Sequence, residues 1–202
     1  MDKKTILVGL GSFALIAVVA VGVILFTKPA SFRGTTFVEP YPTAPEIELT
    51  RSDGTNFRLS ELRGEVVLLF FGYTSCPDEC PTTLAELKLA LTKLTEKDAS
   101  KVKVLFVTVD PVRDTPALVQ EYLDHFNKAF IGLGGAQTAL EKVWQSYGIY
   151  SEAAPGASAA GYTVDHTARV TLIDQQGNLR VSFGLGTPVD DIVHDLELIL
   201  NE

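Results

Sequence analysis

The sequence of 202 residues predicts an α/β domain built on a mixed β-sheet that is covered by helices. Two continuous apolar runs, residues 65–72 and 102–110, are typical of strands that are buried on both faces of a sheet. Each run is followed by a segment with helical features, and a helix between two strands implies that the strands pair in parallel. Residues 168–174 and 179–186 flank a Gln-Gln-Gly-Asn turn and predict an antiparallel hairpin at the edge of this sheet.

The first thirty residues predict a membrane anchor. Residues 5–26 contain no charged side chain, and a helix of these 22 residues is long enough to span a bilayer. Two lysines precede the run, which keeps the N-terminus in the cytoplasm and puts the rest of the chain on the outer side of an inner or cytoplasmic membrane. A cleaved signal peptide is the alternative, but its apolar region is usually about 7–15 residues and ends in a small-residue cleavage site. We therefore expect a single-pass anchor over residues 1–30.

Residues 31–45 are rich in proline and have no periodic pattern, so they predict an extended linker. The globular domain is then expected over residues 46–202, which is enough chain for one hydrophobic core. Residues 1–30 carry a net charge of +2, and the total of −8 leaves −10 for residues 31–202. Nucleic acid binds clustered lysine and arginine, so this acidic domain predicts no nucleic-acid partner.

The other elements alternate along the chain. Residues 47–59 predict a hairpin that turns at Asp53-Gly54. A short strand is expected near residues 129–131, and the small-residue stretch 151–161 predicts a flexible loop. The predicted helices begin with a proline or threonine and then place apolar residues at helical spacing; they cover residues 81–94, 116–126, 138–148 and 188–200.

The only two cysteines, Cys76 and Cys80, lie where the first long strand gives way to the first long helix, in "FFGYTSCPDECPTTL". The carboxyl edge of a sheet at such a point is a usual place for ligands. Pro81 suits the first helical position, so Cys80 is expected at the N-cap, where the helix dipole lowers the pKa of a thiol. A disulfide that closes so short a loop adds little stability, which favours redox chemistry or metal binding over a structural disulfide.

Two thiolates do not complete a typical metal site, so a further donor is needed from the three histidines. His125 and His194 lie in predicted helices and are expected to be partly exposed there. His166 ends the small-residue loop and precedes a strand, so the fold can return it to the edge that carries the cysteines. Two thiolates and an imidazole suit Cu(I) or Cu(II), whereas zinc normally takes a fourth ligand. The neighbouring Asp165 is a candidate for orienting the imidazole.

Three charged residues, Asp110, Arg113 and Asp114, follow the second apolar run in "VDPVRDTP". Their position beyond a strand end allows two interpretations. They order the loop that faces the cysteines, or they cap the turn that leads into the next helix. We do not assign them as ligands.

Three sequence blocks occur in order along the chain, "LFFGYTSCPDECPTTL", "FVTVDPVRDTP" and "DHTARVTLID". Together with the N-terminal anchor they resemble the Sco/SenC family over roughly residues 32–200. C-x3-C alone is a weak signal, whereas the ordered combination is highly specific. The resemblance implies a thioredoxin-like fold with an extra N-terminal β-hairpin and a membrane anchor.

The resemblance also implies a function. Family members act in the assembly of cytochrome c oxidase and bind one copper ion through the two motif cysteines and the distal histidine, which are Cys76, Cys80 and His166 here. The expected role is that of a copper metallochaperone, and the expected partner is oxidase subunit II or another copper acceptor. A movement of the loop at residues 151–165 is expected to lift His166 away and open the ion to the acceptor.

Two alternatives stay open. Cys76 and Cys80 could be the redox-active pair of a thiol-disulfide reductase that reduces the copper-site cysteines of subunit II, or the chain could be a copper-responsive redox sensor. The thioredoxin family proper has C-x-x-C and a facing cis-proline, whereas this chain has C-x3-C and Asp165-His166-Thr167 in the corresponding region. This departure favours metal binding over general disulfide exchange.

Overall fold

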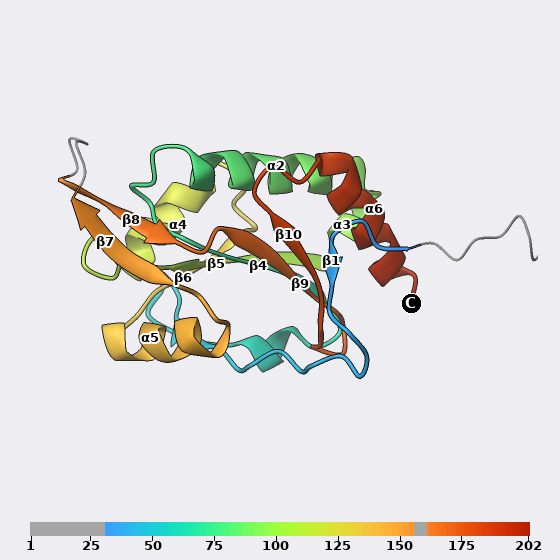
Figure 1. Ribbon diagram of the computed structural model, residues 1–202, viewed down its shortest axis with the longest axis horizontal. Helices are drawn as coiled ribbons and strands as arrows, with labels where there is room; N and C mark the ends of the chain where they lie inside the picture. Colours follow the sequence, from blue (N-terminus) through green and yellow to red (C-terminus); the bar gives the residue numbers. More distant parts are fainter. Residues whose placement is uncertain (1–30, 156–160) are drawn as a thin grey trace, which may run out of the picture. The chain divides into compact units, whose positions relative to one another are not determined.

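The computed structural model describes residues 31–155 and 161–202 of the chain (Figure 1). Phe32 to Glu202 form one compact unit around a six-stranded sheet in the order β1-β10-β9-β4-β5-β6. Its strands are β1 (Thr35–Thr36), β4 (Val66–Gly72), β5 (Val102–Thr108), β6 (Ile131–Leu133), β9 (Arg169–Ile173) and β10 (Leu179–Gly184). Because β4 pairs in parallel with β5 and antiparallel with β9, the predicted mixed sheet is confirmed.

The central strands form because their side chains are apolar on both faces. All seven residues of β4 are buried, and Phe70 of β4 meets Phe106 of β5 edge to face at 5.7 Å. Burying one such side chain contributes about 1.5–3 kcal/mol to folding. The two strands end side by side, with Gly72 opposite Thr108, so the loops that follow them leave the sheet at the same edge.

Helices cover both faces of the sheet. They are α2 (Glu79–Lys93), α3 (Glu96–Ala99), α4 (Pro116–Asp124), α5 (Gln137–Ser146) and α6 (Val189–Leu200), with a 3-10 turn η1 (Leu59–Leu62). Figure 1 shows α2 and α6 over one face and α5 over the other. Leu84, Leu87 and Ala90 of α2 are buried at three-residue spacing, which confirms the amphipathic helix predicted there.

Two short ribbons lie outside the main sheet. β2 (Glu48–Thr50) and β3 (Asn56–Arg58) form the predicted hairpin, with Gly54 in the turn at a φ of 81° that favours glycine. β7 (Ser151–Pro155) and β8 (Tyr162–His166) form a second antiparallel ribbon. The predicted flexible loop is therefore wrong for residues 151–155, and residues 156–160 lie outside the described part. Alanine-rich chain has low strand propensity, so pairing with β8 decides the structure here.

Residues 32–45, most of the predicted linker, lie against the domain. β1 pairs with β10 at the edge of the sheet. The backbone N–H groups of Arg33 and Gly34 donate to the carboxylate of Asp195 at 2.8 and 2.9 Å, which holds this segment on α6. The compact unit accordingly begins at Phe32.

None of the helices within residues 31–155 and 161–202 is both long and apolar enough to cross a bilayer. The predicted membrane span, residues 5–26, lies outside that part of the chain. The single-pass anchor therefore stays a prediction.

Candidate metal centre

The fold brings the three predicted ligands to one end of the sheet. Cys76 and Cys80 follow β4, and His166 is the last residue of β8. The Cys80 sulfur lies 3.9 Å from Nε2 of His166, although 86 positions separate the two residues in sequence. Figure 1 shows β8 beside the loop that joins β4 to α2. His125 is the C-cap residue of α4 and His194 lies within α6, and neither lines the cavity in front of Cys76.

The first turn of α2 gives the two sulfurs different surroundings. The helix begins at Glu79 with Asp78 as its N-cap residue, so the prediction of Cys80 at the N-cap is wrong by two residues. Pro81 fits the third helical position because the N–H groups of the first turn have no helical partner in any case. The Asp78 side chain makes no cap, and the Cys76 sulfur accepts the N–H of Cys80 at 3.4 Å instead.

The two cysteines also differ in acidity. A hydrogen bond from the Cys80 thiol lowers the pKa of Cys76 to about 5, opposed by partial burial and helped by the backbone N–H groups of Cys80 and Asp78. The same hydrogen bond and burial raise the pKa of Cys80. The prediction of a lowered pKa at Cys80 is therefore wrong. Cys76 is the partly exposed thiolate, and Cys80 is the buried thiol.

The imidazole of His166 is oriented through its other nitrogen. Nδ1 lies 3.3 Å from the backbone oxygen of Val164, and since a carbonyl oxygen only accepts, a hydrogen bond there requires the proton on Nδ1. Nε2 then carries the free electron pair on the side of the Cys80 sulfur. The Tyr73 ring supports the imidazole edge to face, with the centroids 5.6 Å apart and the planes at 82°. This arrangement leaves Nε2 ready to bind a metal.

An open cavity of about 410 Å³ lies in front of Cys76 and His166. Its other lining residues are Tyr73, Pro77, Asp78, Glu79, Thr163, Val164 and Asp165. Three of these side chains are carboxylates, so the mouth of the cavity attracts cations. The oxygen beside Nδ1 of His166 belongs to Val164, and not to Asp165 as predicted.

Asp114 fixes the loop that carries Cys76. Its carboxylate accepts the N–H of Thr74 at 3.0 Å, the Thr74 hydroxyl at 2.6 Å and the Thr108 hydroxyl at 2.7 Å. Burial raises the pKa of Asp114, and these hydrogen bonds oppose the rise. Of the two interpretations of the charged residues after β5, loop ordering is the one that these contacts support for Asp114.

The donor set fits a metal ion that prefers sulfur. Bonds of the length that zinc makes to thiolate and imidazole, about 2.3 and 2.0 Å, span the 3.9 Å between Cys80 Sγ and His166 Nε2 with an ion between the atoms. Cys76 would be a third donor if its sulfur exchanged the contact with the α2 N–H for one with the ion. Within residues 31–155 and 161–202, no three His, Cys, Asp or Glu side chains already stand in a closed metal site. Two sulfurs and one imidazole are a donor set that suits copper.

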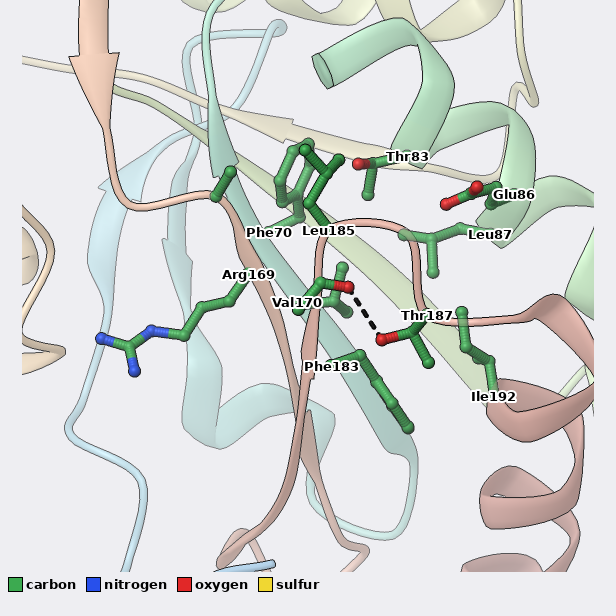
Figure 2. Close-up of a pocket in the computed structure, with 12 residues that line it drawn as sticks. Phe70, Thr83, Glu86, Leu87, Arg169, Val170, Phe183, Leu185, Thr187 and Ile192 are labelled. Atoms are coloured by element: carbon green, nitrogen blue, oxygen red, sulfur yellow. Dashed lines mark hydrogen bonds between the residues drawn. The ribbon is translucent and has the colours of Figure 1, made fainter. Parts of the chain in front are cut away.

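A second pocket lies between α2, α6 and the ends of β9 and β10, as Figure 2 shows. Its volume is about 10 Å³, which is room for about one water molecule at most. Phe70, Leu87, Phe183 and Ile192 make its lining largely apolar, and the Thr187 hydroxyl on its rim donates to a backbone oxygen at 2.8 Å. We interpret this pocket as a packing gap and not as a binding site.

Comparison with known proteins agrees with the chemistry of this site. A family profile described as SCO1/SenC matches residues 38–201. The chain belongs to the SCO1/SenC family. An SCO2-like protein of Rickettsia felis, for example, is 31% identical over 171 residues, which cover 84% of this chain and 83% of the relative. The family membership predicted from the three sequence blocks is confirmed.

Solved structures of SCO1/SenC proteins have the same fold. The apo Sco1 protein of Thermus thermophilus is 36% identical, with a TM-score of 0.75 over 85% of this chain and 99% of that structure. ScoI of Bradyrhizobium japonicum, solved with copper bound, is 38% identical, with a TM-score of 0.70 over 78% of this chain and 99% of that structure. These likenesses confirm the thioredoxin-like fold.

Tyr73 and Tyr162 had no predicted role in this SCO1/SenC chain, although the Tyr73 ring meets His166 and Tyr162 begins the strand that His166 ends. The signal for Tyr162 is the two-residue period of a strand, which puts it on the same face as His166. That signal exists only once residues 162–166 are recognised as a strand. Tyr73 lies inside the first sequence block, but nothing in one sequence shows that its ring meets an imidazole from β8.

Proposed function

We propose that this chain is a copper metallochaperone that binds one copper ion through Cys76, Cys80 and His166 and passes it to an acceptor during assembly of cytochrome c oxidase. The observation that carries the proposal is the 3.9 Å approach of His166 Nε2 to Cys80 Sγ, beside an open cavity. The copper-bound ScoI of Bradyrhizobium japonicum supports the choice of metal. The expected acceptor is the copper site of oxidase subunit II, and copper is the cargo.

Each ligand has its own task. Cys76 lines the cavity and is a thiolate near neutral pH, so it is the first donor that the ion meets. Cys80 is a buried thiol and releases its proton when it binds, because the thiolate is the form that holds metals. His166 completes the set through Nε2, while Nδ1 keeps its proton beside the carbonyl oxygen of Val164.

Copper binding by the full chain tests the proposal. The chain, purified in detergent under anaerobic reducing conditions, should hold one copper ion per molecule in metal analysis. With Cu(II) it should show a thiolate-to-copper charge-transfer band that Cys76→Ser and Cys80→Ser each remove, and His166→Ala should lower the affinity. His125→Ala is the matched control, since that residue ends α4 and does not line the cavity. A band that survives in both cysteine variants contradicts the ligand assignment.

We further propose that residues 1–30 form a single-pass membrane anchor and that the domain, which begins at Phe32 and so includes most of the predicted linker, lies on the outer side of the inner or cytoplasmic membrane. The uncharged run 5–26, preceded by two lysines, supports this topology. Protease added to intact spheroplasts should digest the domain. A domain that resists digestion until the membrane is opened contradicts the topology.

A second candidate function, thiol-disulfide reduction, is favoured by the difference in acidity between the two cysteines. The Cys76 thiolate attacks one sulfur of a substrate disulfide, forms a mixed disulfide and releases the other substrate sulfur as a thiolate. Cys80 then gives up its proton and attacks the Cys76 sulfur. This step closes a Cys76–Cys80 disulfide, releases the second substrate thiolate and completes the transfer of two electrons to the substrate.

His166→Ala separates the two functions. The variant should lose copper retention, because one of the three ligands is gone, and should still reduce a disulfide peptide that carries the copper-site cysteines of subunit II. Failure of this variant to support oxidase assembly in cells favours copper delivery. Full support of assembly favours the reductase.

A further inference from the structure

Arg113 lies between the loop that carries the cysteines and the β7–β8 ribbon that carries His166. Its side chain is 18% exposed and belongs to the loop after β5. Nε donates to the carboxylate of Asp110, and Nη1 donates to the backbone oxygen of Tyr162 at 3.0 Å. The Tyr162 hydroxyl donates to the same Asp110 carboxylate at 2.8 Å, so the three residues close a ring of contacts. Because Tyr162 is the first residue of β8, this ring joins β8 to the body of the domain.

The same guanidinium also stacks on two tyrosine rings. Its Cζ atom lies 3.7 Å from the centroid of the Tyr162 ring and 5.6 Å from the centroid of the Tyr73 ring. Both distances are within the range of about 6 Å in which a cation is attracted to an aromatic face. Tyr73 is the ring that meets the His166 imidazole edge to face. Arg113 therefore contacts both the ribbon that carries His166 and the ring that supports its imidazole.

Tyr162 and His166 lie on the same strand, so the contacts that hold Tyr162 also affect the position of His166. Alternate side chains of a strand point to the same side, so Tyr162, Val164 and His166 share one face. Val164 is 6% exposed, which places this face against the domain. A two-stranded ribbon is only marginally stable by itself, so its position depends on contacts of this kind. The Ser151 hydroxyl of β7 supplies another, at 3.2 Å from the backbone oxygen of Val109.

The cysteine half of the site is attached to the same loop. Asp114, the next residue after Arg113, accepts both the N–H and the hydroxyl of Thr74, two positions before Cys76. The loop of residues 110–114 thus holds the cysteine loop through Asp114 and the β7–β8 ribbon through Arg113.

We propose that Arg113 is a positioning residue that seats the β7–β8 ribbon so that His166 Nε2 stays within reach of the Cys80 sulfur. The inference rests on the proposed copper site and names the residue that sets how easily the histidine leaves the metal. Lysine does not substitute here, because one ammonium group cannot bind a carboxylate and a carbonyl oxygen while it stacks on two aromatic faces. When the ribbon lifts, the ion keeps two sulfur ligands and is open to an acceptor.

Arg113→Lys tests the proposal, with Arg180→Lys as its matched control. Arg180 is also buried between carboxylates and aromatic rings, but it lies at the other end of the sheet. In the metal-free full chain, hydrogen–deuterium exchange of the β8 amides should rise about tenfold in Arg113→Lys, which corresponds to about 1.4 kcal/mol of local stability, and should not change in the control.

The copper-loaded chain supplies the second readout. The dissociation constant for Cu(I) should rise about tenfold in Arg113→Lys and stay unchanged in Arg180→Lys. The coupling of the imidazole nitrogen in the electron paramagnetic resonance spectrum of the Cu(II) form should weaken in Arg113→Lys alone. A residue that merely stabilises the fold does not change this coupling.

The results of these experiments test the role of Arg113 and the proposed metal site separately. Equal β8 exchange in the two lysine variants overturns the role of Arg113, and so does faster exchange with unchanged imidazole coupling. If His166→Ala leaves copper affinity unchanged, the proposed metal site fails, and β8 exchange still decides whether Arg113 seats the ribbon. Tyr162→Phe keeps the ring and loses only the hydroxyl bond to Asp110, so it should raise β8 exchange about threefold and tests the proposal even if Arg113→Lys does not fold.

Discussion

Two arginines, the partly buried Arg113 and the buried Arg180, have similar surroundings at opposite ends of the sheet. Arg180 pairs with Asp174 at 3.1 Å and with both carboxylate oxygens of Glu202 at 2.5 and 2.8 Å, and its Cζ lies 4.1 Å from the centroid of the Tyr41 ring. The partners of Arg113 are comparable and include the Asp110 carboxylate, the backbone oxygen of Tyr162 and the rings of Tyr73 and Tyr162. The difference lies in what each arginine joins.

Arg180 joins the last residue of the chain and the segment around Tyr41 to β10, a strand of the main sheet. Arg113 joins a loop of the main sheet to a ribbon that lies outside it. The buried partner of Arg180, Asp174, follows a strand of the main sheet, whereas we propose that the ribbon held by Arg113 can lift while the core stays folded. In our proposal, the same chemistry therefore stabilises the fold at one end and positions His166 at the other.

Arg180→Met should have the largest effect on stability. It leaves the buried carboxylate of Asp174, 3% exposed, without its cation. Removing one partner of a buried ion pair typically costs about 3–5 kcal/mol. The free energy of unfolding from urea titration should fall by that amount, with no change in the copper charge-transfer band. A loss below about 1 kcal/mol, typical of surface pairs, contradicts the contrast between the two arginines.

Arg113→Met should cost less global stability, although Asp110 is also buried. When the ribbon lifts, water reaches the Asp110 carboxylate, and this local opening limits the loss to about 2 kcal/mol. Hydrogen–deuterium exchange of the β8 amides should instead be faster in Arg113→Met than in Arg180→Met. Equal losses in the urea titrations of Arg113→Met and Arg180→Met mean that the ribbon is not a separate opening unit.

Thr74→Val extends the comparison to the cysteine loop. The variant removes the hydroxyl that donates to Asp114 at 2.6 Å and should cost about 1 kcal/mol. Burial raises the pKa of Asp114 and the Thr74 hydrogen bond opposes the rise, so the variant raises that pKa further. The loss should be largest where Asp114 is ionised and should shrink as the pH falls toward the usual value of 3.8. Thr92→Val, on an exposed helix surface, is a control that should show no such pH dependence.

The smallest effect concerns the reactivity of the cysteines. In the metal-free chain, alkylation of Cys76 by iodoacetamide should increase as the pH rises through about 5, because the thiolate is the nucleophile. Cys80 should stay unreactive, since it is buried and its pKa is raised. Arg113→Lys should leave the Cys76 midpoint almost unchanged, because the main cause of the lowered pKa is the hydrogen bond from the Cys80 thiol, which does not involve the β7–β8 ribbon. Labelling of Cys80 before Cys76 contradicts the assigned order of the two thiols.

The core of the fold was predictable because its signals are local. Continuous apolar runs predict β4 and β5, and the spacing of Leu84 and Leu87 predicts α2. The start of α2 was not predictable, because Pro81 is tolerated at the third helical position as well as at the first. The β7–β8 ribbon was missed for a different reason. Ala153 and Ala154 have little strand preference of their own, and their pairing depends on a partner strand that follows a further stretch of chain.

Which residues meet at the candidate site was predictable, and how they contact one another was not. Cys76, Cys80 and His166 follow from residue type and from the three sequence blocks. The acidity order depends on which thiol donates to the other and on the Cys80 N–H that meets the Cys76 sulfur, and both are properties of the folded turn. The contact of Arg113 with Tyr162 spans 49 positions, so no pattern within one sequence indicates it.

In the metal-free chain, the Cys76 sulfur accepts a hydrogen bond from the backbone N–H of Cys80 in the first turn of α2. If Cys76 binds copper as we propose, the sulfur would release the backbone N–H of Cys80 as it takes the ion. Release of the ion would restore that hydrogen bond, which would partly offset the lost sulfur–metal bond. A small free-energy gap between full and empty forms is what distinguishes a carrier from a storage protein.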